Sequence, residues 1–203
     1  MSVQIAILVE GGTEKAFFPI LREFLATRLT GRMPKLDPVP YDGRIPKGDR
    51  LSRRVTNLLR GSNAADAVVA ITDIYTGSDD FSDADDAKAK MRAWVGDEPR
   101  FYPHVALHDF EAWLLPFWPV IQELAGSNRV IPGNHPETVN HQKPPARVLA
   151  EVFRTGSRAR AYVKTRDALR ILRNKDLRVA ADACPELRSF LNTILTLSGG
   201  SPL

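Results

Sequence analysis

The stretch Ile5–Glu14 (IAILVEGGTE) constrains the fold of this chain more than any other part of its sequence. Five apolar residues are followed by Glu10, two glycines, a threonine and Glu14, and an amphipathic segment begins at once. A short apolar run of this kind is typical of a buried strand in a parallel sheet. The glycines permit a tight turn, and Thr13 is the expected N-cap of the following helix. The sequence therefore predicts an α/β fold with Glu10 at the ligand-binding edge of the sheet.

A second apolar run, Ala67–Thr72, also ends in a carboxylate, Asp73. A helical pattern at residues 49–60 precedes it, and right-handed crossovers make such strands parallel, so Glu10 and Asp73 are expected at the same edge. Two carboxylates that meet there can bind Mg²⁺ or Mn²⁺. The simpler alternative is that Glu10 and Glu14 only complement the positive end of a helix dipole.

A third strand, predicted at Phe101–Leu107, brings further polar groups to the same kind of junction. His108 and Glu111 follow it, where the apolar pattern changes to a helical period. Residues three apart share one face of a helix, so both side chains are candidates for the site. A histidine at a strand end is otherwise a structural residue, but the carboxylates at the other strand ends favour the functional interpretation.

The composition indicates a globular chain of one or two compact domains, with 43% hydrophobic residues among 203. The single cysteine excludes an internal disulfide and fits a reducing compartment. The first apolar run is too short to cross a bilayer and lacks a preceding basic region, so neither a membrane span nor a secretion signal is expected. We therefore expect a cytoplasmic protein without a membrane partner.

The net charge of +4 hides a strong separation of charge along the chain. Seven aspartates and no lysine or arginine occur from Asp66 to Asp86, whereas ten basic and three acidic residues from Arg147 to Arg178 give that segment a net charge of +7. A metal-dependent phosphodiesterase needs both features, because carboxylates hold a hard cation and basic residues hold a polyanion. The alternative, that charged helices simply face water, applies to most of these residues.

The remaining pattern predicts one sheet flanked by helices and a helical C-terminal part. Helices are expected at 14–29, 49–60, 83–95, 145–154, 163–173 and 185–197, and a proline-interrupted edge strand at 36–41. The long stretch 126–143 is expected to be functional or mobile. Arg44, Lys47 and Arg50 occupy a Gly/Pro loop that reaches an anionic ligand or is simply solvated. Two units are predicted, an α/β domain at 1–124 and a loop and helical lobe at 125–203.

Several short motifs, in this order, resemble a known family. Val9–Glu14, followed by a strand that ends in Asp73, resembles the Toprim fold of topoisomerases, primases and overcoming-lysogenization-type nucleases. The chain is more narrowly similar to the bacterial Toprim-like family designated domain of unknown function 4276, over about residues 3–197. The motifs that carry this likeness are Asp73-Ile74-Tyr75 with Asp80-Phe81, His108-Asp109-Phe110-Glu111-Ala112, Pro136-Glu137 with Asn140, and Lys143-Pro144.

The resemblance implies a Rossmann-like Toprim sheet, mostly parallel and flanked by helices, with a helical C-terminal lobe and a metal-dependent site. It implies that Glu10 corresponds to the Toprim glutamate, a general acid/base or metal ligand, and Asp73 to the first aspartate of the Toprim Asp-x-Asp pair. Proteins of this kind are often found beside ABC/AAA-type ATPases in phage-defence systems. The resemblance therefore also implies a possible ATPase partner.

The chain departs from the Toprim pattern at the second aspartate, where Tyr75 stands. A phenol is a poor ligand for Mg²⁺. Either Asp79, Asp80 or Glu111 completes the metal shell, or metal affinity is weak and catalysis is lost.

The favoured hypothesis is metal-dependent hydrolysis of phosphodiesters in DNA or RNA, with Mg²⁺ or Mn²⁺ as cofactor. A proton-transfer group and a cation that neutralises the phosphate would complete such a site. The candidate metal ligands are Glu10, Asp73, Glu111 and Asp80. The candidate catalytic residues are Glu10 and Asp73, with Glu14 or His108 as the proton-transfer group and Lys143 as the neutralising cation.

The main alternative is a catalytically degenerate Toprim-like module that binds nucleic acid or an ATPase partner without cutting, and Tyr75 is its best support. A nucleotide-binding P-loop is not expected. The stretch Gly11-Gly12-Thr13 lacks the lysine that reaches the phosphates in the Gly-x-x-x-x-Gly-Lys-Ser/Thr pattern.

Overall fold

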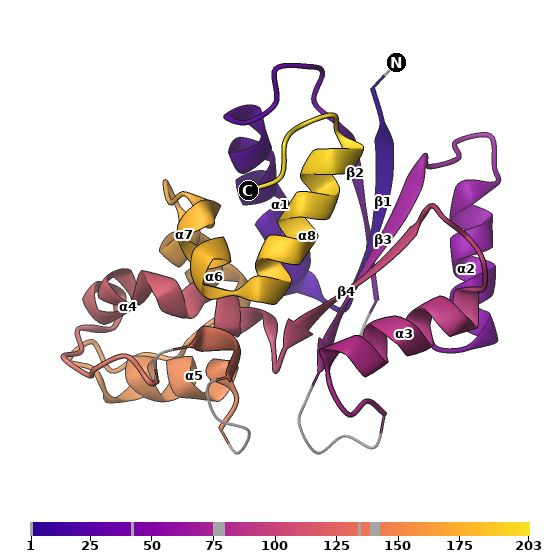
Figure 1. The fold of residues 1–203 in the computed structure, drawn as a ribbon. Helices are drawn as coiled ribbons and strands as arrows, with labels where there is room; N and C mark the ends of the chain where they lie inside the picture. Colours follow the sequence, from indigo (N-terminus) through magenta and orange to yellow (C-terminus); the bar gives the residue numbers. More distant parts are fainter. Residues whose placement is uncertain (1, 42, 75–79, 134, 139–142) are drawn as a thin grey trace.

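A four-stranded parallel sheet forms the centre of the computed structural model (Figure 1), which describes the chain except residues 1, 42, 75–79, 134 and 139–142. The strands are β1 (Gln4–Val9), β2 (Lys35–Pro40), β3 (Ala67–Ile74) and β4 (Phe101–Leu107), in the spatial order β2-β1-β3-β4. Each neighbouring pair is parallel. The predicted α/β fold with a parallel sheet is therefore confirmed.

Helices cover both faces of the sheet. On one face lie α1 (Gly12–Ala26) and α8 (Pro185–Leu197), and on the other lie α2 (Asp49–Leu59) and α3 (Ala84–Val95). Side chains of a strand alternate between faces, so Ile5, Ile7 and Val9 pack with α1 while Ala6 and Leu8 pack with α2. This burial on both faces is why the first strand reads as an unbroken apolar run.

Both outer strands of the sheet have features that hinder hydrogen bonding at their free edges. Pro38 and Pro40 lie in β2, where they remove backbone N–H donors, and the predicted edge position of residues 36–41 is confirmed. At the other margin, Lys88 Nζ of α3 pairs with Glu186 Oε1 of α8 at 3.0 Å. Both helices pack against β4 from opposite faces, so this ion pair links them around the last strand.

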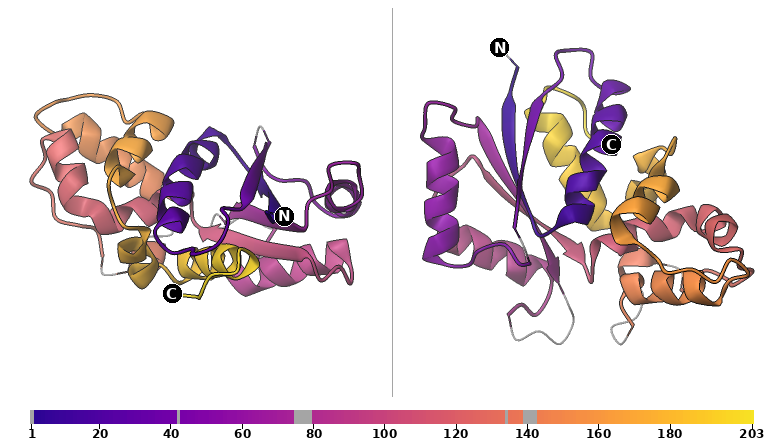
Figure 2. Two further views of the ribbon diagram at one scale, coloured as in Figure 1. Left: turned by 90° about the horizontal axis from the view of Figure 1, so that it is seen from above. Right: turned by 180° about the vertical axis from the view of Figure 1, so that it is seen from behind.

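A group of short helices lies to one side of the sheet (Figures 1 and 2). At its centre is the 3₁₀ helix η1 (Phe110–Phe117), in which every side chain except Pro116 is buried. Around η1 pack α4, α5, α6, α7 and η2. Their bounds are α4 (Trp118–Ala125), η2 (Pro136–Thr138), α5 (Pro145–Thr155), α6 (Lys164–Leu172) and α7 (Leu177–Ala183). None of the helices in the described part of the chain is long and apolar enough to cross a membrane.

One hydrophobic core extends across both predicted units, 1–124 and 125–203, the second of which is expected to pack on the first. One continuous buried cluster contains Ile5 of β1, Trp113 of η1, Phe153 of α5 and Phe190 of α8. Since α8 returns to the sheet and packs against β4, only the segment before it forms the lateral helical lobe. The helical lobe and the sheet therefore fold around common side chains.

The first turn of α1 differs from the prediction. Gly11, in extended backbone with φ −162°, is the N-cap, and it provides no side-chain hydrogen bond. Thr13, predicted as the cap, lies inside the first turn and is 8% exposed. The helix therefore begins two residues earlier than predicted. A Cβ atom on Gly11 would lie 3.3 Å from Glu14 Oε2, so a residue without a side chain suits the close turn from β1 into α1.

Gly156, the C-cap of α5, lies where its backbone nearly touches the end of α4. A Cβ atom there would lie 2.1 Å from Ala125 O and 2.9 Å from Ala125 C. We expect Gly156→Ala to lower the free energy of unfolding by about 2–3 kcal/mol, because backbone must move to accommodate the methyl group. Gly31→Ala is the matched control, since nothing lies within 4 Å of its Cβ position. Chemical denaturation should separate the two variants; equal stability would show that the α4–α5 contact is loose.

Candidate active site: an acidic centre at the carboxyl edge of the sheet

Among the residues that the structure describes, five carboxylates gather at the carboxyl edge of the sheet, and we call them the acidic centre. They are Glu10 after β1, Glu14 in the first turn of α1, Asp73 in β3, and Asp109 and Glu111 after β4. Because β1 and β3 are adjacent and parallel, the predicted emergence of Glu10 and Asp73 at one edge is confirmed. The edge lies at the bottom of Figure 1, beside the helical lobe.

Glu10 is held by groups from two neighbouring segments. Thr72 Oγ1 donates a hydrogen bond to Glu10 Oε1, as expected from a strand register in which Leu8 lies beside Ala70. The backbone N–H of Ile45 donates a second hydrogen bond to the carboxylate. Burial and repulsion from Glu14 nevertheless raise the pKa of Glu10, so the surroundings disfavour the ionised form of this carboxyl.

Asp73 is the carboxyl of the acidic centre that is repelled by all four others. Burial raises its pKa well above the ordinary value of 3.8, and the charges of Glu10, Glu14, Asp109 and Glu111 raise it further, in that order. Asp73 therefore lies within electrostatic reach of all four other carboxylates. A compensating positive charge would be required for all five to be ionised together.

Asp109 and Glu111 are the most deeply buried members of the acidic centre, at 1% exposure each. Burial raises the pKa of both carboxyls, and repulsion from Glu111 adds to the rise at Asp109. Two groups of the helical lobe oppose the negative charge. Lys164 Nζ lies 3.3 Å from Glu111 Oε1, and Tyr162 Oη donates to the same oxygen at 3.5 Å.

Asp109 also connects the acidic centre to the lobe. Its Oδ2 accepts a hydrogen bond of 3.0 Å from the backbone N–H of Ala146, in the first turn of α5, whose own N-cap residue is Pro144. Its Oδ1 is buried and makes no hydrogen bond within the described structure. A buried carboxylate oxygen of this kind is costly unless a cation or water completes it.

His108 adopts a left-handed backbone conformation, which few residues other than glycine tolerate. Its φ is +72°, its residue exposure is 3%, and its backbone N–H donates to Ile74 O. A left-handed conformation costs about 1–2 kcal/mol for a residue with a Cβ. Such cost is concentrated at functional positions, and here it turns the chain from β4 so that Asp109 and Glu111 face the acidic centre.

Two predicted site residues are engaged outside the acidic centre. Asp80, a predicted metal ligand, instead pairs with Arg44 and Lys47. Lys143, predicted to neutralise the phosphate, pairs with Glu151, which also holds Arg129 at 2.9 Å. Both residues lie on loops, where the nearest opposite charge decides the side-chain position. Tyr75 and Asp79, the residues on which the Toprim comparison turned, lie outside the described residues.

The acidic centre has the chemistry of a cation site but not its compact geometry. Among the described residues, no three His, Cys, Asp or Glu side chains are gathered tightly enough to hold a metal ion. Strand alternation is one reason: Leu8 and Ile71 face opposite sides of the sheet, so Glu10 and Asp73, each two residues further on, start from opposite sides. Buried oxygen donors with raised pKa values still fit a hard divalent ion, which would replace their protons.

The basic segment 147–178 is only partly available to a ligand. Asp167, with no exposed surface, accepts hydrogen bonds of 2.8 Å from Arg160 and 3.0 Å from Arg166. Burial opposes its ionisation, but these hydrogen bonds outweigh burial and hold the pKa of Asp167 at about 2. Other basic side chains of the segment are exposed: Arg147, Arg154, Arg158, Arg173 and Lys175.

The comparisons with known proteins give a family without an assigned activity. The family described as a domain of unknown function (DUF4276) matches residues 9–195, a range that contains the whole acidic centre. The chain belongs to this family. No curated protein and no solved structure matches it.

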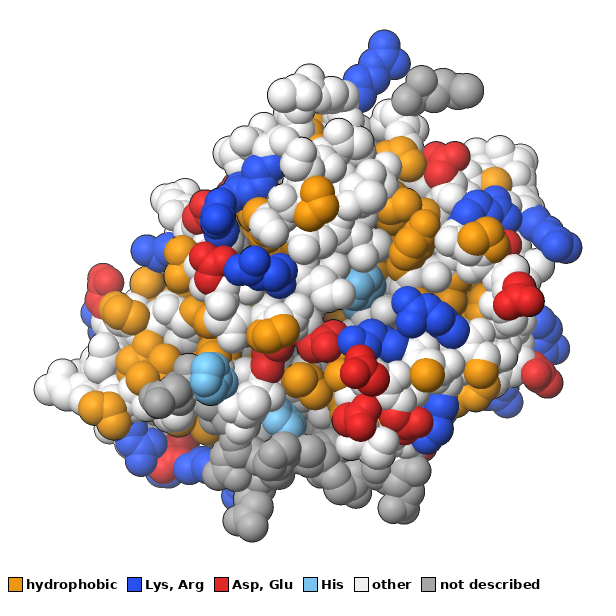
Figure 3. Space-filling model, in the orientation of Figure 1, with side chains coloured by type: hydrophobic (Ala, Val, Ile, Leu, Met, Phe, Trp, Pro, Cys, Tyr) orange, Lys and Arg blue, Asp and Glu red, His pale blue; other side chains and the backbone are white. Residues whose placement is uncertain are grey.

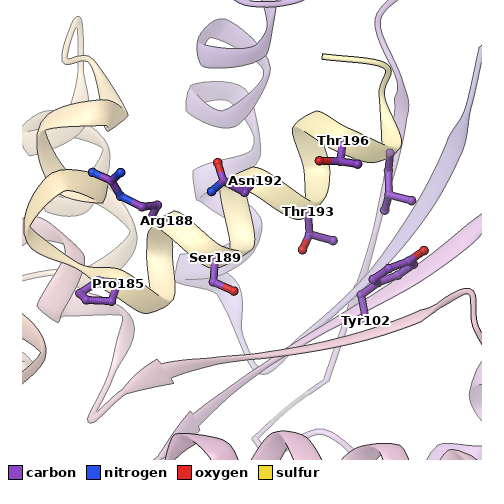
Figure 4. A pocket seen from close by; sticks show the side chains of 8 residues that line it. Tyr102, Pro185, Arg188, Ser189, Asn192, Thr193 and Thr196 are labelled. Atoms are coloured by element: carbon purple, nitrogen blue, oxygen red, sulfur yellow. The ribbon is translucent and has the colours of Figure 1, made fainter. Parts of the chain in front are cut away.

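A groove of the DUF4276 chain lies away from the acidic centre. It runs between α8 and the early part of β4 (Figure 4) and is lined by Tyr102, Pro185, Arg188, Ser189, Asn192, Thr193, Thr196 and Leu197. No carboxylate of the acidic centre lines it. Figure 4 shows hydroxyl and amide groups of α8 along this groove, which is a separate surface of the molecule.

The sequence missed four residues of this DUF4276 site, namely Thr72, Asp109, Tyr162 and Lys164. Asp109 stood within the quoted His108–Ala112 motif, but the i and i+3 rule for an α-helix selected its neighbours. Thr72 became recognisable only when the register placed it beside Glu10. No local signal marks Tyr162 and Lys164, which reach Glu111 from 51 and 53 residues away.

Proposed function

We propose that this protein is a divalent-metal-dependent phosphodiesterase that acts on nucleic acid. The observation that supports this proposal most directly is the group of five carboxylates at the ligand-binding edge of an α/β sheet, where burial and then the four neighbouring charges raise the pKa of Asp73. Structural ion pairs bring opposite charges together. Five carboxyl groups at one edge, several of them with raised pKa values, indicate a site that works with a cation, Mg²⁺ or Mn²⁺.

In this proposal Asp73, Glu111, Asp109 and Glu10 would hold the cation after drawing closer together than they are in this structure, in which no three described ligand side chains are gathered tightly enough for a metal ion. A bound Mg²⁺ or Mn²⁺ would polarise the phosphate and lower the pKa of a water molecule. Thr72 and the N–H of Ile45 orient Glu10, while Lys164 and Tyr162 orient Glu111. Glu14, in the first turn of α1, is the group placed to take a proton from the attacking water.

The substrate class follows from charge. The exposed arginines of α5 and of the segment before α6 lie in the lobe that supplies Lys164 to the acidic centre. A Cβ on Gly12, at the start of α1, would lie 3.5 Å from Thr165 Cγ2, so the amino end of α6 adjoins the same edge. Basic side chains beside a carboxylate site suit a phosphate polymer better than a small neutral substrate.

The Toprim likeness of Val9–Glu14 and Asp73 agrees with this proposal and adds two elements to it. One is a place in a prokaryotic defence system. The other is a partner ATPase of the ABC/AAA type, which would regulate cleavage.

The test is cleavage of labelled single- and double-stranded DNA and RNA with Mn²⁺ or Mg²⁺. We expect Glu10→Gln and Glu111→Gln to lose at least about 100-fold in rate, since each loses a negative charge at the reacting centre. Glu98→Gln is the charge-matched control, because Glu98 precedes β4 at the opposite edge and pairs with Arg100. Cleavage by Glu10→Gln at the rate of the parent protein would overturn the proposal.

A second candidate function is a non-catalytic nucleic-acid-binding module. It is favoured by the ion pair of Lys164 with Glu111, in which a lysine supplies the positive charge that a metal would otherwise bring. Calorimetry with Mn²⁺ distinguishes the two candidates. A dissociation constant weaker than millimolar, together with retained binding of oligonucleotides, would support the module and exclude the enzyme.

A further inference from the structure

A loop with two cations lies directly beside the acidic centre. The segment after β2 is fixed to the end of β1 by two backbone contacts, Gly43 N–H to Glu10 O at 3.2 Å and Ile45 N–H to the Glu10 carboxylate. Arg44 therefore has a defined position beside Glu10, where its charge lowers the pKa of that carboxyl, and Lys47 follows in the same loop. The pocket that they line also includes Thr72 and Asp73 at the end of β3.

One carboxylate occupies the space between these two cations. Asp80 Oδ2 contacts both Arg44 Nη1 and Lys47 Nζ. The same residue accepts a hydrogen bond of 3.0 Å from Lys90 Nζ through its backbone oxygen. Hydrogen bonding to Lys47, together with the charge of Arg44, lowers the pKa of Asp80, so it stays ionised at neutral pH. We call Arg44, Lys47 and the space between them the cation cradle.

The cation cradle has the exposure of an exchangeable site rather than of a structural ion pair. The side chains of Arg44, Lys47 and Asp80 are 44%, 38% and 32% exposed. Ion pairs in contact with water contribute little to stability, so Asp80 can leave at small cost. Figure 3 shows acidic and basic side chains side by side over the lower part of the molecule, near the carboxyl edge.

The neighbourhood of the cradle adds an aromatic surface. Phe81 follows Asp80, is partly exposed, and has the ammonium groups of Lys47 and Lys90 each 5.8 Å from its ring centroid. Trp94 lies beside it, with ring centroids 6.0 Å apart. Cations interleaved with aromatic rings are typical of surfaces that hold a phosphate backbone.

We propose that Arg44 and Lys47 form a phosphate-binding subsite next to the acidic centre, and that the Asp80 carboxylate occupies it in the free protein and must leave when a phosphate binds. A carboxylate and a phosphate offer the same kind of oxygen acceptors to a guanidinium group. Asp80 thus acts as an internal competitor of the ligand. The location of the subsite does not depend on the proposed function. Only the identification of a nucleic acid as the natural source of the phosphate rests on that function.

The experiment measures binding without cleavage, in EDTA, with a fluorescent single-stranded DNA oligonucleotide in one arm and inorganic pyrophosphate in the other. We expect Asp80→Asn to bind about fivefold more tightly, because one competing charge is removed near the phosphate. Arg44→Gln and Lys47→Gln should each weaken binding by a similar factor. The slope of log affinity against log salt concentration should fall by about 0.7 in magnitude for each lost cation, the value for a single strand.

Glu98→Gln is again the control, since it changes net charge by the same amount and removes a carboxylate from Arg100 at the other edge of the sheet. The proposal is overturned if Asp80→Asn binds no more tightly than Glu98→Gln, if the Arg44 and Lys47 variants bind like the parent, or if no variant binds either probe. A response to the oligonucleotide alone assigns a polymer substrate, and a response to pyrophosphate as well assigns a site for free phosphates.

These outcomes are independent of catalysis. Tighter binding by Asp80→Asn in EDTA, with no cleavage under any metal, would retain the subsite and reject the phosphodiesterase. Cleavage that depends on Glu10, with no effect of Asp80→Asn on binding, would do the reverse. Thermal unfolding of each variant excludes a loss of fold as the cause.

Discussion

Asp73→Asn is expected to abolish metal-dependent hydrolysis while making the metal-free protein more stable. The amide keeps the shape of the carboxylate but removes the charge that Glu10, Glu14, Asp109 and Glu111 all repel. We expect a loss of at least about 100-fold in cleavage rate. We also expect an unfolding temperature higher by roughly 2–5 °C at about pH 8, the shift that about 1–2 kcal/mol produces in a chain of this size.

The sign of the pH dependence follows from the direction of the pKa shift. In the folded chain the pKa of Asp73 lies well above 3.8, its ordinary value, so the parent protein loses stability as the pH rises through the folded value. Below the ordinary value the carboxyl is protonated in both the folded and the unfolded state. The stability advantage of Asp73→Asn should therefore be present near pH 8 and absent at about pH 4 or lower.

Thermal unfolding followed by circular dichroism, in EDTA and in Mn²⁺, checks both parts of this prediction. Mn²⁺ should raise the unfolding temperature of the parent protein more at about pH 8 than at about pH 5, since the cation competes with protons for the same oxygens. Asp73→Asn should lose most of this metal response. Asp37→Asn, a change at an exposed aspartate of β2, is the control. A variant that is destabilised in EDTA at high pH would contradict the proposed repulsion.

The largest loss of stability is expected from Glu137→Ala. Glu137 is 4% exposed and accepts hydrogen bonds from Trp113 Nε1 at 3.1 Å and from the backbone N–H groups of Glu186 at 3.0 Å and Leu187 at 3.3 Å. It therefore caps α8, whose own N-cap, Cys184, provides no side-chain hydrogen bond. Removing three hydrogen bonds to a buried charge should cost about 3–5 kcal/mol, or on the order of 10 °C in unfolding temperature.

Glu137→Gln separates the cap from the packing. Its amide oxygen still accepts from Trp113, but its NH₂ group would face the Glu186 N–H, so an intermediate loss of about 1–2 kcal/mol is expected. Near-ultraviolet circular dichroism should report the change, because Trp113 stacks on Phe190 of α8 with centroids 6.2 Å apart. Equal stability of the alanine variant and the parent would show that α8 does not need this cap.

The order of the secondary structure could be predicted because its signals are local. The apolar run Phe101–Leu107 and the helical period at 185–197 predict the bounds that the structure shows, and apolar runs separated by helical segments predict the parallel sheet. Asp73 was expected after its strand but lies within β3, which continues to Ile74. The sequence does not decide whether such a carboxylate is the last residue of a strand or the first residue after it. Here the hydrogen bonding of β3 to β4 extends the strand to Ile74.

The arrangement of the site could be predicted only in part, because it depends on contacts between distant segments. Glu10, Glu14, Asp73 and Glu111 do gather at one edge, as their places after strands indicated. Asp80, one of the residues predicted to complete the metal shell in place of Tyr75, is held by two cations of another loop. The role of the Pro136–Glu137 motif was equally hidden: without the fold, a glutamate in a long polar stretch gives no sign that it caps a helix 49 residues away.

The link between Lys88 and Glu186 has a consequence for how copies of the chain meet one another. It closes the margin of β4 on one side, where Pro103 also lacks a donor and the Phe101 N–H is already bonded to Glu98 O. Prolines interrupt β2 on the other side. Neither end of the sheet offers an intact row of hydrogen-bonding groups to a neighbouring molecule, so this architecture resists stacking into extended β-assemblies even when the protein is concentrated.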